Sequence, residues 1–194
     1  KKVHIGLITE IPSVRRRWTD IHGTEPTSKD VDDMFESFVP AQEACLSEYS
    51  ELIPGTNEVV DECRKRGYKI GSTSGYLPGM LAINQADGEK QGYKPDATFG
   101  AGDVPRGRPF GHMVLRNILE LDVSPVQSVV KVDDTLTGIE EGLNAGGWGV
   151  GLAISGNEVG MQLDEWNALS DDVKQAHRDR IYPTMYQRGA HYVI

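Results

Sequence analysis

The stretch SVVKVDDTLTGIEEGLNAGGWGVG, residues 128–151, decides the fold of this chain. A short, largely apolar run at 129–132 predicts an interior strand, and this strand ends on two adjacent carboxylates, Asp133 and Asp134. A threonine turn, a helix and a second apolar run at 150–154 follow. Two apolar runs separated by one helix are typical of a β-α-β unit in a parallel sheet.

The two acids stand at the carboxyl end of the predicted strand. Ligands of open α/β sheets bind at this edge, and carboxylate oxygens are preferred ligands of hard divalent cations. Asp133 and Asp134 therefore indicate a metal site. The alternative is that the pair only begins the next helix, with one residue as its N-cap.

Helical and strand patterns alternate on both sides of this unit. The turn signal at Ile53, Pro54 and Gly55 marks our predicted boundary between a helical unit, residues 1–52, and an α/β core domain, residues 53–194. The core pattern predicts helices at 56–66, 77–91 and 110–121, strands at 68–76, 96–100 and 190–194, and a helical tail at 163–188 with a break near Pro183. Such alternation predicts a doubly wound, parallel, Rossmann-like sheet.

Residues 1–52 predict mainly helix. A polar helix ends at Gly23, and a second begins at Thr27, which has capping-box spacing to Asp30. Pro40 is expected to kink or divide this second helix. Only 3–8 could form a strand in this half.

Composition and charge exclude several functions. The net charge of −9 argues against a nucleic-acid partner, because binding to phosphate backbones needs clustered positive charge. The sequence contains no apolar run long enough to span a membrane. Cys45 and Cys63 have no metal-site spacing, which favours buried thiols in a reducing cytoplasm.

Three features that could serve a phosphoryl group occur at successive strand ends. They are a hydroxyl-rich turn, a basic loop and the acid pair: Ser72, Thr73, Ser74, Gly75; Arg106, Arg108; Asp133, Asp134. Hydroxyl and amide donors hold phosphoryl oxygens, a guanidinium offsets their charge, and a metal bridges them to carboxylates. Taken alone, each feature also fits an ordinary turn, a solvated loop charge or a helix start.

These residues carry a resemblance to a known superfamily. The order of hydroxyl, basic residue and acid pair resembles motifs two, three and four of the haloacid dehalogenase superfamily. The segments KIGSTSGY, GAGDVPRGRPFGHM, VVKVDDTLTGIEEGLNAGGWGVGLAISGNEVG and GAHYVI resemble its phosphonoacetaldehyde hydrolase family more closely, and they cover most of the chain. The resemblance implies a haloacid dehalogenase-like core with a small helical cap, residues 1–52, and cleavage of a carbon–phosphorus bond.

The resemblance also implies roles for individual residues. Ser74 and Gly75 would bind the phosphoryl oxygens, and Arg108 would bind the phosphonate. Asp134 would be a ligand of Mg²⁺, with Asp133 as a second acid near the metal. Many superfamily members have a further aspartate four residues after the metal acid; here that position is glycine, and the adjacent acid pair resembles a known variant of the motif.

Three further residues match the family's cap-facing chemistry. Tyr76 resembles an active-site tyrosine, and Lys1 with His4 matches a K-x-x-H context in which the lysine forms a Schiff base with the substrate aldehyde. A protonated imine is an electron sink for the breaking carbon–phosphorus bond, and the lysine must be neutral to form it. The alternative for Lys1 and His4 is a frayed, solvated terminus.

One expected motif is missing from the chain. The superfamily's nucleophile is an aspartate in a D-x-x-G-T context at the end of the first, central strand, and no predicted strand of this chain ends in such a segment. We therefore expect that the sheet has a gap, that the complete protein begins before Lys1 and continues beyond Ile194, and that the 194-residue chain alone is inactive.

The sequence thus predicts a cytoplasmic, magnesium-dependent phosphonatase that releases acetaldehyde and phosphate from phosphonoacetaldehyde through a lysine imine and an aspartyl phosphate. The resemblance implies a homodimer formed through the caps. One alternative is a capped phosphatase or phosphomutase of the same superfamily that acts on a small phosphate ester. Another is a non-catalytic interaction domain whose acids are only surface charges.

Overall fold

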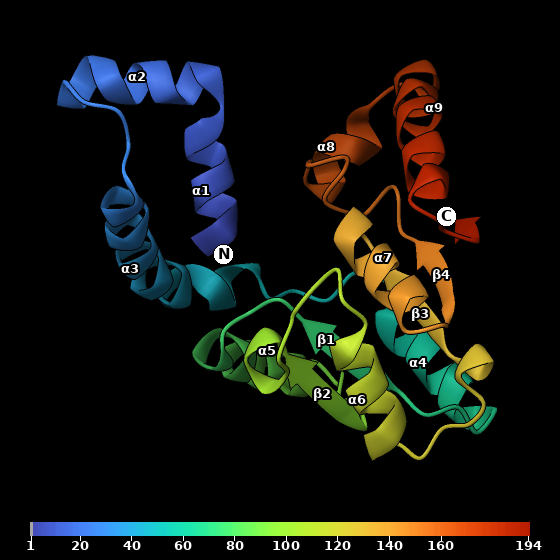
Figure 1. Cartoon of the computed structure of the whole chain (residues 1–194). Helices are drawn as coiled ribbons and strands as arrows, with labels where there is room; N and C mark the ends of the chain where they lie inside the picture. Colours follow the sequence, from blue (N-terminus) through green and yellow to red (C-terminus); the bar gives the residue numbers. More distant parts are fainter. Residues whose placement is uncertain (1) are drawn as a thin grey trace.

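The helical cap consists of three helices that stand apart from the strands in the computed structural model, which describes residues 2–194 (Figure 1). They are α1 (Lys2–Glu10), α2 (Pro12–His22) and α3 (Ser28–Cys45). The segment 3–8, the one strand candidate in this half, is helical instead. Gly23 ends α2 in the left-handed conformation with φ 75°, and a reciprocal capping box between Thr27 and Asp30 begins α3, as the sequence predicts.

A linker joins the cap to the α/β part. Helix α3 is not divided at Pro40, which lies inside it. The short 3-10 helix η1 (Leu46–Tyr49) follows, and Gly55, with φ 88°, precedes α4 (Thr56–Lys65). Because L side chains rarely adopt this positive φ, glycine suits the turn into α4. The division into domains at residues 52 and 53 stays a prediction.

The α/β part alternates strands and helices as predicted. In chain order its first elements are β1 (Gly71–Ser74), α5 (Pro78–Lys90), β2 (Ala97–Gly100), η2 (Ala101–Asp103), α6 (His112–Glu120), η3 (Val126–Ser128), β3 (Val130–Asp133), α7 (Leu136–Asn144) and β4 (Trp148–Gly151). The chain ends with α8 (Leu163–Ala168), α9 (Asp171–Gln187) and β5 (Tyr192–Val193). All strand pairs are parallel, which confirms the predicted α/β class.

The strands form two separate parallel sheets instead of one. β1 pairs with β2, while β3, β4 and β5 form a second sheet in that order. Within residues 2–194, β1 and β3 each therefore have one strand edge that pairs with no other strand. This break agrees with the expected gap between the hydroxyl strand and the acid strand.

Strand β3 is less buried than its apolar sequence predicts. Val130 is 57% exposed and Val132 is 50% exposed, whereas Asp133 is buried. Side chains alternate between the two faces of a strand, so Lys131 and Asp133 share the face that α7 covers. The apolar run indicated a strand buried on both faces, but the described residues cover only one.

The C-terminal part holds the main hydrophobic core. Ile139 of α7 packs with residues of α9 and β5, and the members of this cluster are Ile139, Ala153, Ile181, Met185, Ala190 and Val193. The predicted break near Pro183 is wrong, since α9 runs through it and the chain instead leaves the helix between α8 and α9. Burial of Ile181 and Met185 on either side of Pro183 offsets its missing backbone hydrogen bond.

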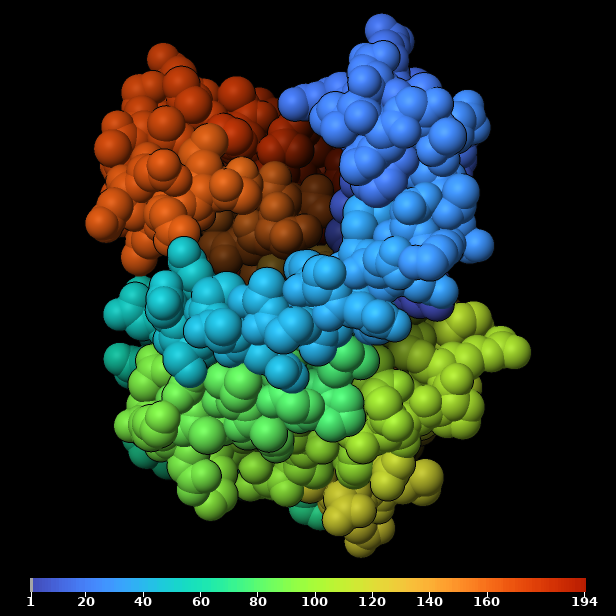
Figure 2. Space-filling model, turned by 90° about the vertical axis from the view of Figure 1, so that its left-hand side faces the viewer, coloured from blue at the N-terminus to red at the C-terminus, as the bar shows by residue number. Residues whose placement is uncertain are grey.

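The cap and the C-terminal helices rise on opposite sides of the molecule (Figure 1). Figure 2 shows a hollow between the cap and the C-terminal residues, with the segment around η1 below it. Among the described residues, no helix has the length and apolar character needed to cross a lipid bilayer.

Candidate functional site

Arg108 connects the ends of the two sheets. Its Nη2 donates to the backbone oxygen of Thr73 on β1 at 3.2 Å, and it forms an ion pair with Asp133 on β3 at 2.9 Å. Its Nε donates to Glu141 of α7 at 3.1 Å. The loop that follows β2 thus brings a guanidinium to the place where β1 and β3 both end.

Two glycines of α7 make room for charged side chains of β3. A Cβ atom at Gly138 would lie 2.1 Å from the carboxylate carbon of Asp133, and one at Gly142 would lie 2.5 Å from the Cβ of Lys131. Gly138 and Gly142 are four residues apart and therefore share one helix face. Because this face lacks side chains at both positions, α7 lies close enough to β3 to bury Lys131 and Asp133 beneath it.

The result is a buried, charge-balanced group of four residues, which we call the ion cluster: Arg108, Lys131, Asp133 and Glu141. Lys131 pairs with Asp133 and lies 3.8 Å from Glu141. Glu141 is fully buried, and the Thr73 hydroxyl donates to it at 2.9 Å. The two cations offset two carboxylates, which is the condition under which charges are tolerated away from water.

Sequence reasoning missed Lys131 and Glu141. Both left a signal: Lys131 interrupts an otherwise apolar strand two residues before Asp133, so the two share a face. Glu141 stands between Gly138 and Gly142 on the face of α7 that packs on the strand. A lysine and two acids at these spacings indicate ion pairs between a strand and its following helix.

Asp133 is ionised within the cluster. Burial opposes its charge, but the Lys131 and Arg108 charges, together with hydrogen bonds from Lys131 and Thr135, outweigh burial and hold the pKa of the Asp133 carboxyl below its ordinary value. The Thr135 hydroxyl donates to Asp133 at 2.7 Å and also caps α7 by accepting from the Gly138 amide. The oxygens of Asp133 are therefore occupied by protein donors.

Asp134 differs from its neighbour. It is half-buried, and its Oδ2 accepts a hydrogen bond from the Asn157 amide at 3.0 Å. A carboxylate with a second oxygen that no other residue is shown to occupy suits a hard divalent cation. Within residues 2–194, however, no three acidic, histidine or cysteine side chains are arranged to hold a metal. The described residues fit one protein ligand of a metal rather than a complete site.

The hydroxyl turn lies at the end of β1, next to the Thr73 that Arg108 contacts. The Ser74 hydroxyl accepts a hydrogen bond from the Tyr76 amide at 3.1 Å, which fixes the turn. A Cβ atom at Gly75 would meet no atom within 4 Å, so there is open space beside this residue. Ser74, Gly75 and Tyr76 thus follow β1 at the same edge at which Asp134 follows β3.

His4 lies on a different part of the molecule. It is exposed on α1, which packs against α2 and α3 of the cap. Figure 1 places the beginning of α1 on the side that faces the α/β part. Lys1, the predicted Schiff-base lysine, lies outside the described residues. The contact between cap and strand ends that the family chemistry requires stays a prediction.

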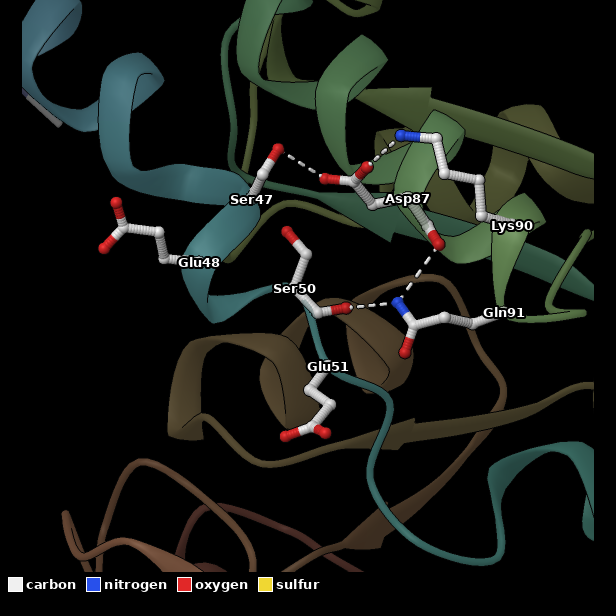
Figure 3. A pocket seen from close by; sticks show the side chains of 7 residues that line it. All are labelled: Ser47, Glu48, Ser50, Glu51, Asp87, Lys90 and Gln91. Atoms are coloured by element: carbon white, nitrogen blue, oxygen red, sulfur yellow. Dashed lines mark hydrogen bonds and ion pairs between the residues drawn. The ribbon is translucent and has the colours of Figure 1, made fainter.

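A second polar site lies on the linker, away from the ion cluster. Figure 3 shows the pocket between η1 and α5, where Ser47 donates to Asp87 at 2.6 Å. The Gln91 side chain donates to the Ser50 backbone oxygen at 2.7 Å and accepts from the Leu52 amide at 3.0 Å. These residues bind the linker to α5, and we call them the linker clamp: Ser47, Ser50, Leu52, Asp87, Lys90 and Gln91.

Comparison with known proteins shows to which family this chain belongs. The model of the haloacid dehalogenase-like hydrolases matches residues 8–146. The chain is 41% identical over 194 residues to the phosphonoacetaldehyde hydrolase of Hahella chejuensis, and 41% identical over 192 residues to that of Vibrio cholerae. It belongs to the phosphonoacetaldehyde hydrolase family of haloacid dehalogenase-like hydrolases.

The match extends over the whole chain but not over the whole relatives. The alignments cover 100% and 98% of this chain, and 66% and 71% of the two relatives. A crystal structure of a phosphonoacetaldehyde hydrolase-like protein from Oleispira antarctica superposes with a TM-score of 0.94 at 42% identity, covering 100% of this chain and 70% of that one. The family resemblance inferred from the motifs is therefore confirmed, and so is the fold.

Proposed function

We propose that this protein hydrolyses the carbon–phosphorus bond of phosphonoacetaldehyde to acetaldehyde and phosphate. The observation that carries the proposal is the position of Arg108, which bridges the ends of β1 and β3 beside Ser74 and Asp134. Its support is the family to which the chain belongs and the curated relatives that bear this activity as their name. A guanidinium at converging strand ends is suited to a tetrahedral anion.

Each predicted residue has a part in this proposal. Ser74 and Gly75 donate to the phosphoryl oxygens, and Arg108 offsets their charge. The Lys1 amine adds to the aldehyde and water is lost, and the imine takes up the electron pair when the carbon–phosphorus bond breaks. The phosphoryl group passes to the nucleophilic aspartate that the family resemblance implies and then to water, while protonation and hydrolysis of the resulting enamine release acetaldehyde and return the lysine. His4 carries protons for imine formation, and Tyr76 faces the substrate from the β1 turn.

Asp134 is our proposed ligand of Mg²⁺. The ion cluster is balanced, with two cations against two carboxylates, so it has no net charge to offset a doubly charged phosphonate. A bound divalent cation supplies that positive charge. Because protein donors occupy Asp133, we propose Asp133 as a support of Arg108 rather than as a metal ligand.

The test is product formation by the protein expressed from its complete reading frame. We expect acetaldehyde and phosphate in equal amounts, dependence on Mg²⁺, and a covalent adduct on the lysine after borohydride treatment with the aldehyde. Turnover of phosphate esters without an adduct would instead indicate a phosphatase. The 194-residue chain alone is expected to release neither product, because its one D-x-x-G-T string, at 20–24, lies at the end of helix α2 and does not follow a strand.

The proposed assembly is a cytoplasmic homodimer formed through the helical cap. The cap exposes Val3 at 78% and Leu7 at 63% on one face of α1, and Ile11 at 46% at the junction between α1 and α2. Residues three to four positions apart share a helix face, and a second copy can bury such a face. Leu7→Lys is expected to convert a dimer to a monomer in light scattering after size exclusion. A dimer that survives the substitution would exclude this surface.

A further inference from the structure

Arg108 is held by contacts of unequal length. Its Nη2 pairs with Asp133 at 2.9 Å and its Nε donates to Glu141 at 3.1 Å, whereas Nη1 donates to the second oxygen of Asp133 at only 3.5 Å and to the Thr135 hydroxyl at 3.3 Å. Hydrogen bonds weaken as they lengthen, and 3.5 Å is at their limit. An anion at the strand ends can therefore replace the contacts of Nη1 without disturbing Nε.

Glu141 is unusual among the acids of this chain because it is fully buried. Its Oε2 accepts from Arg108 and from the Thr73 hydroxyl, while its Oε1 has no hydrogen-bond partner in the part of the chain that the structure describes. Buried ion pairs contribute little net stability compared with well-packed apolar residues. The carboxylate at this position therefore needs a reason other than stability.

We propose that Glu141 is the positioning residue of Arg108, an inference that rests on the proposed function. Glu141 holds Nε at the base of the guanidinium, so that Nη1 turns toward the phosphonate oxygens beside Ser74. Glu141 does not touch the substrate itself. Without it, the guanidinium has Asp133 as its remaining carboxylate partner and closes on that residue.

Positioning by Glu141 and a simple electrostatic effect of its charge predict opposite changes in anion affinity when Glu141 is removed. If Glu141 acted only as a negative charge near the site, its removal would strengthen the binding of an anion. If it positions Arg108, its removal weakens anion binding, because Nη1 is drawn to Asp133. The affinity for inorganic phosphate therefore separates the two explanations.

The experiment compares Glu141→Gln with Glu140→Gln in the complete protein. Glu140 is the neighbour on α7 and pairs with Arg188 on the surface, so it is a matched control. Calorimetric titration with phosphate in the presence of Mg²⁺ is expected to show about 10- to 100-fold weaker binding for Glu141→Gln, because a hydrogen bond to a charged group contributes roughly 1.5–3 kcal/mol. Glu140→Gln should bind as the unmodified protein does.

A double-mutant cycle tests whether the effect passes through Arg108. In an Arg108→Ala background, Glu141→Gln should change the phosphate affinity by less than about twofold, because the group that it positions is gone. An undiminished effect in that background would overturn the inference. Equal affinities of Glu141→Gln and the unmodified protein would overturn it as well.

A second variant guards against a folding defect. Glu141→Asp keeps the charge but withdraws the carboxylate from Arg108 by one methylene, and it is also expected to lose affinity. Full phosphate binding by Glu141→Asp would contradict positioning by Nε. Failure of the unmodified protein to bind phosphate would overturn the inference too.

Acetaldehyde release is measured separately from phosphate binding. If the protein binds phosphate but releases no acetaldehyde, the proposed function fails, while the affinities still decide the role of Glu141.

Discussion

The ion cluster and the linker clamp both join segments that are distant in sequence, but they do so in opposite environments. In the cluster, Arg108, whose side chain is 19% exposed, pairs with the fully buried Glu141 of α7. In the clamp, Asp87 meets Ser47 and Lys90 at the surface, as Figure 3 shows. Charges interact strongly where water is excluded and weakly where it screens them. The cluster therefore fixes a geometry, whereas the clamp only biases the position of the linker.

The largest effect on stability is expected at Gly138, where α7 and the Asp133 carboxylate are in closest contact. Gly138→Ala places a methyl group on the Asp133 carboxylate, so that residue must move and its ion pairs break. We expect a loss of about 3–5 kcal/mol in the free energy of unfolding, the usual cost of disrupting a buried ion pair. Urea unfolding of the variant measures it, and phosphate binding should fall in parallel.

Gly6→Ala is the matched control for this substitution. Gly6 lies inside α1, and a Cβ atom there would meet nothing within 4 Å. Alanine favours a helix over glycine by about 1 kcal/mol, so this variant should be slightly more stable than the unmodified protein. Equal stability of the two variants would contradict the prediction, because it would show that Asp133 can move away from the added methyl group without loss of stability.

A smaller effect is expected from Lys131→Met. Methionine replaces the stem of the lysine beneath α7 but removes the charge that pairs with Asp133. Since Arg108 and Thr135 still contact Asp133, we expect a loss of about 1.5–3 kcal/mol, the range for one hydrogen bond to a charged group. Thermal unfolding checks this value.

The comparison with an exposed pair sharpens that prediction. Lys29 and Asp33 form an ion pair on the surface of α3. Lys29→Met should change the melting temperature far less than Lys131→Met, because solvent screens the exposed pair. Similar shifts in the two variants would contradict the importance of burial for the cluster.

The sequence predicts the element order well because that order depends on local signals. Glycine stops such as Gly23 and the capping box at Thr27 act within a few residues, and they appear where expected. The predicted break near Pro183 is wrong because packing overrides a local preference, whereas the helical prediction for residues 1–52 holds at 3–8 as well, the one segment there that could also have formed a strand. The buried neighbours of Pro183 keep α9 continuous, and α1 packs as a helix against α2 and α3.

Some residues of the candidate site could also be predicted from local sequence signals, and others could not. Ser74, Arg108 and Asp134 could be chosen from the sequence because each stands at a strand end, and strand ends of a parallel sheet converge. The ion cluster could not be assembled in this way, because it depends on how closely α7 approaches β3. That distance is set by Gly138 and Gly142, whose empty positions acquire meaning only when the facing side chains are known.

The smallest effect is expected at the linker clamp, from Asp87→Asn. Hydrogen bonds from Lys90 and Ser47 hold the pKa of the Asp87 carboxyl below its ordinary value. A carboxyl whose pKa is lower in the folded state stabilises the fold above its unfolded pKa, and this contribution disappears as the pH falls through the folded pKa. The variant should therefore melt slightly below the unmodified protein at pH 7. The difference should begin to shrink near the ordinary pKa of aspartate and vanish below the lowered pKa of Asp87 in the folded protein. Glu48→Gln removes a charge from the same pocket without touching the hydrogen bonds of Asp87, so it is the control and should melt as the unmodified protein does at pH 7. If the difference persisted in acid, the clamp would act through the shape of Asp87 and not through its charge.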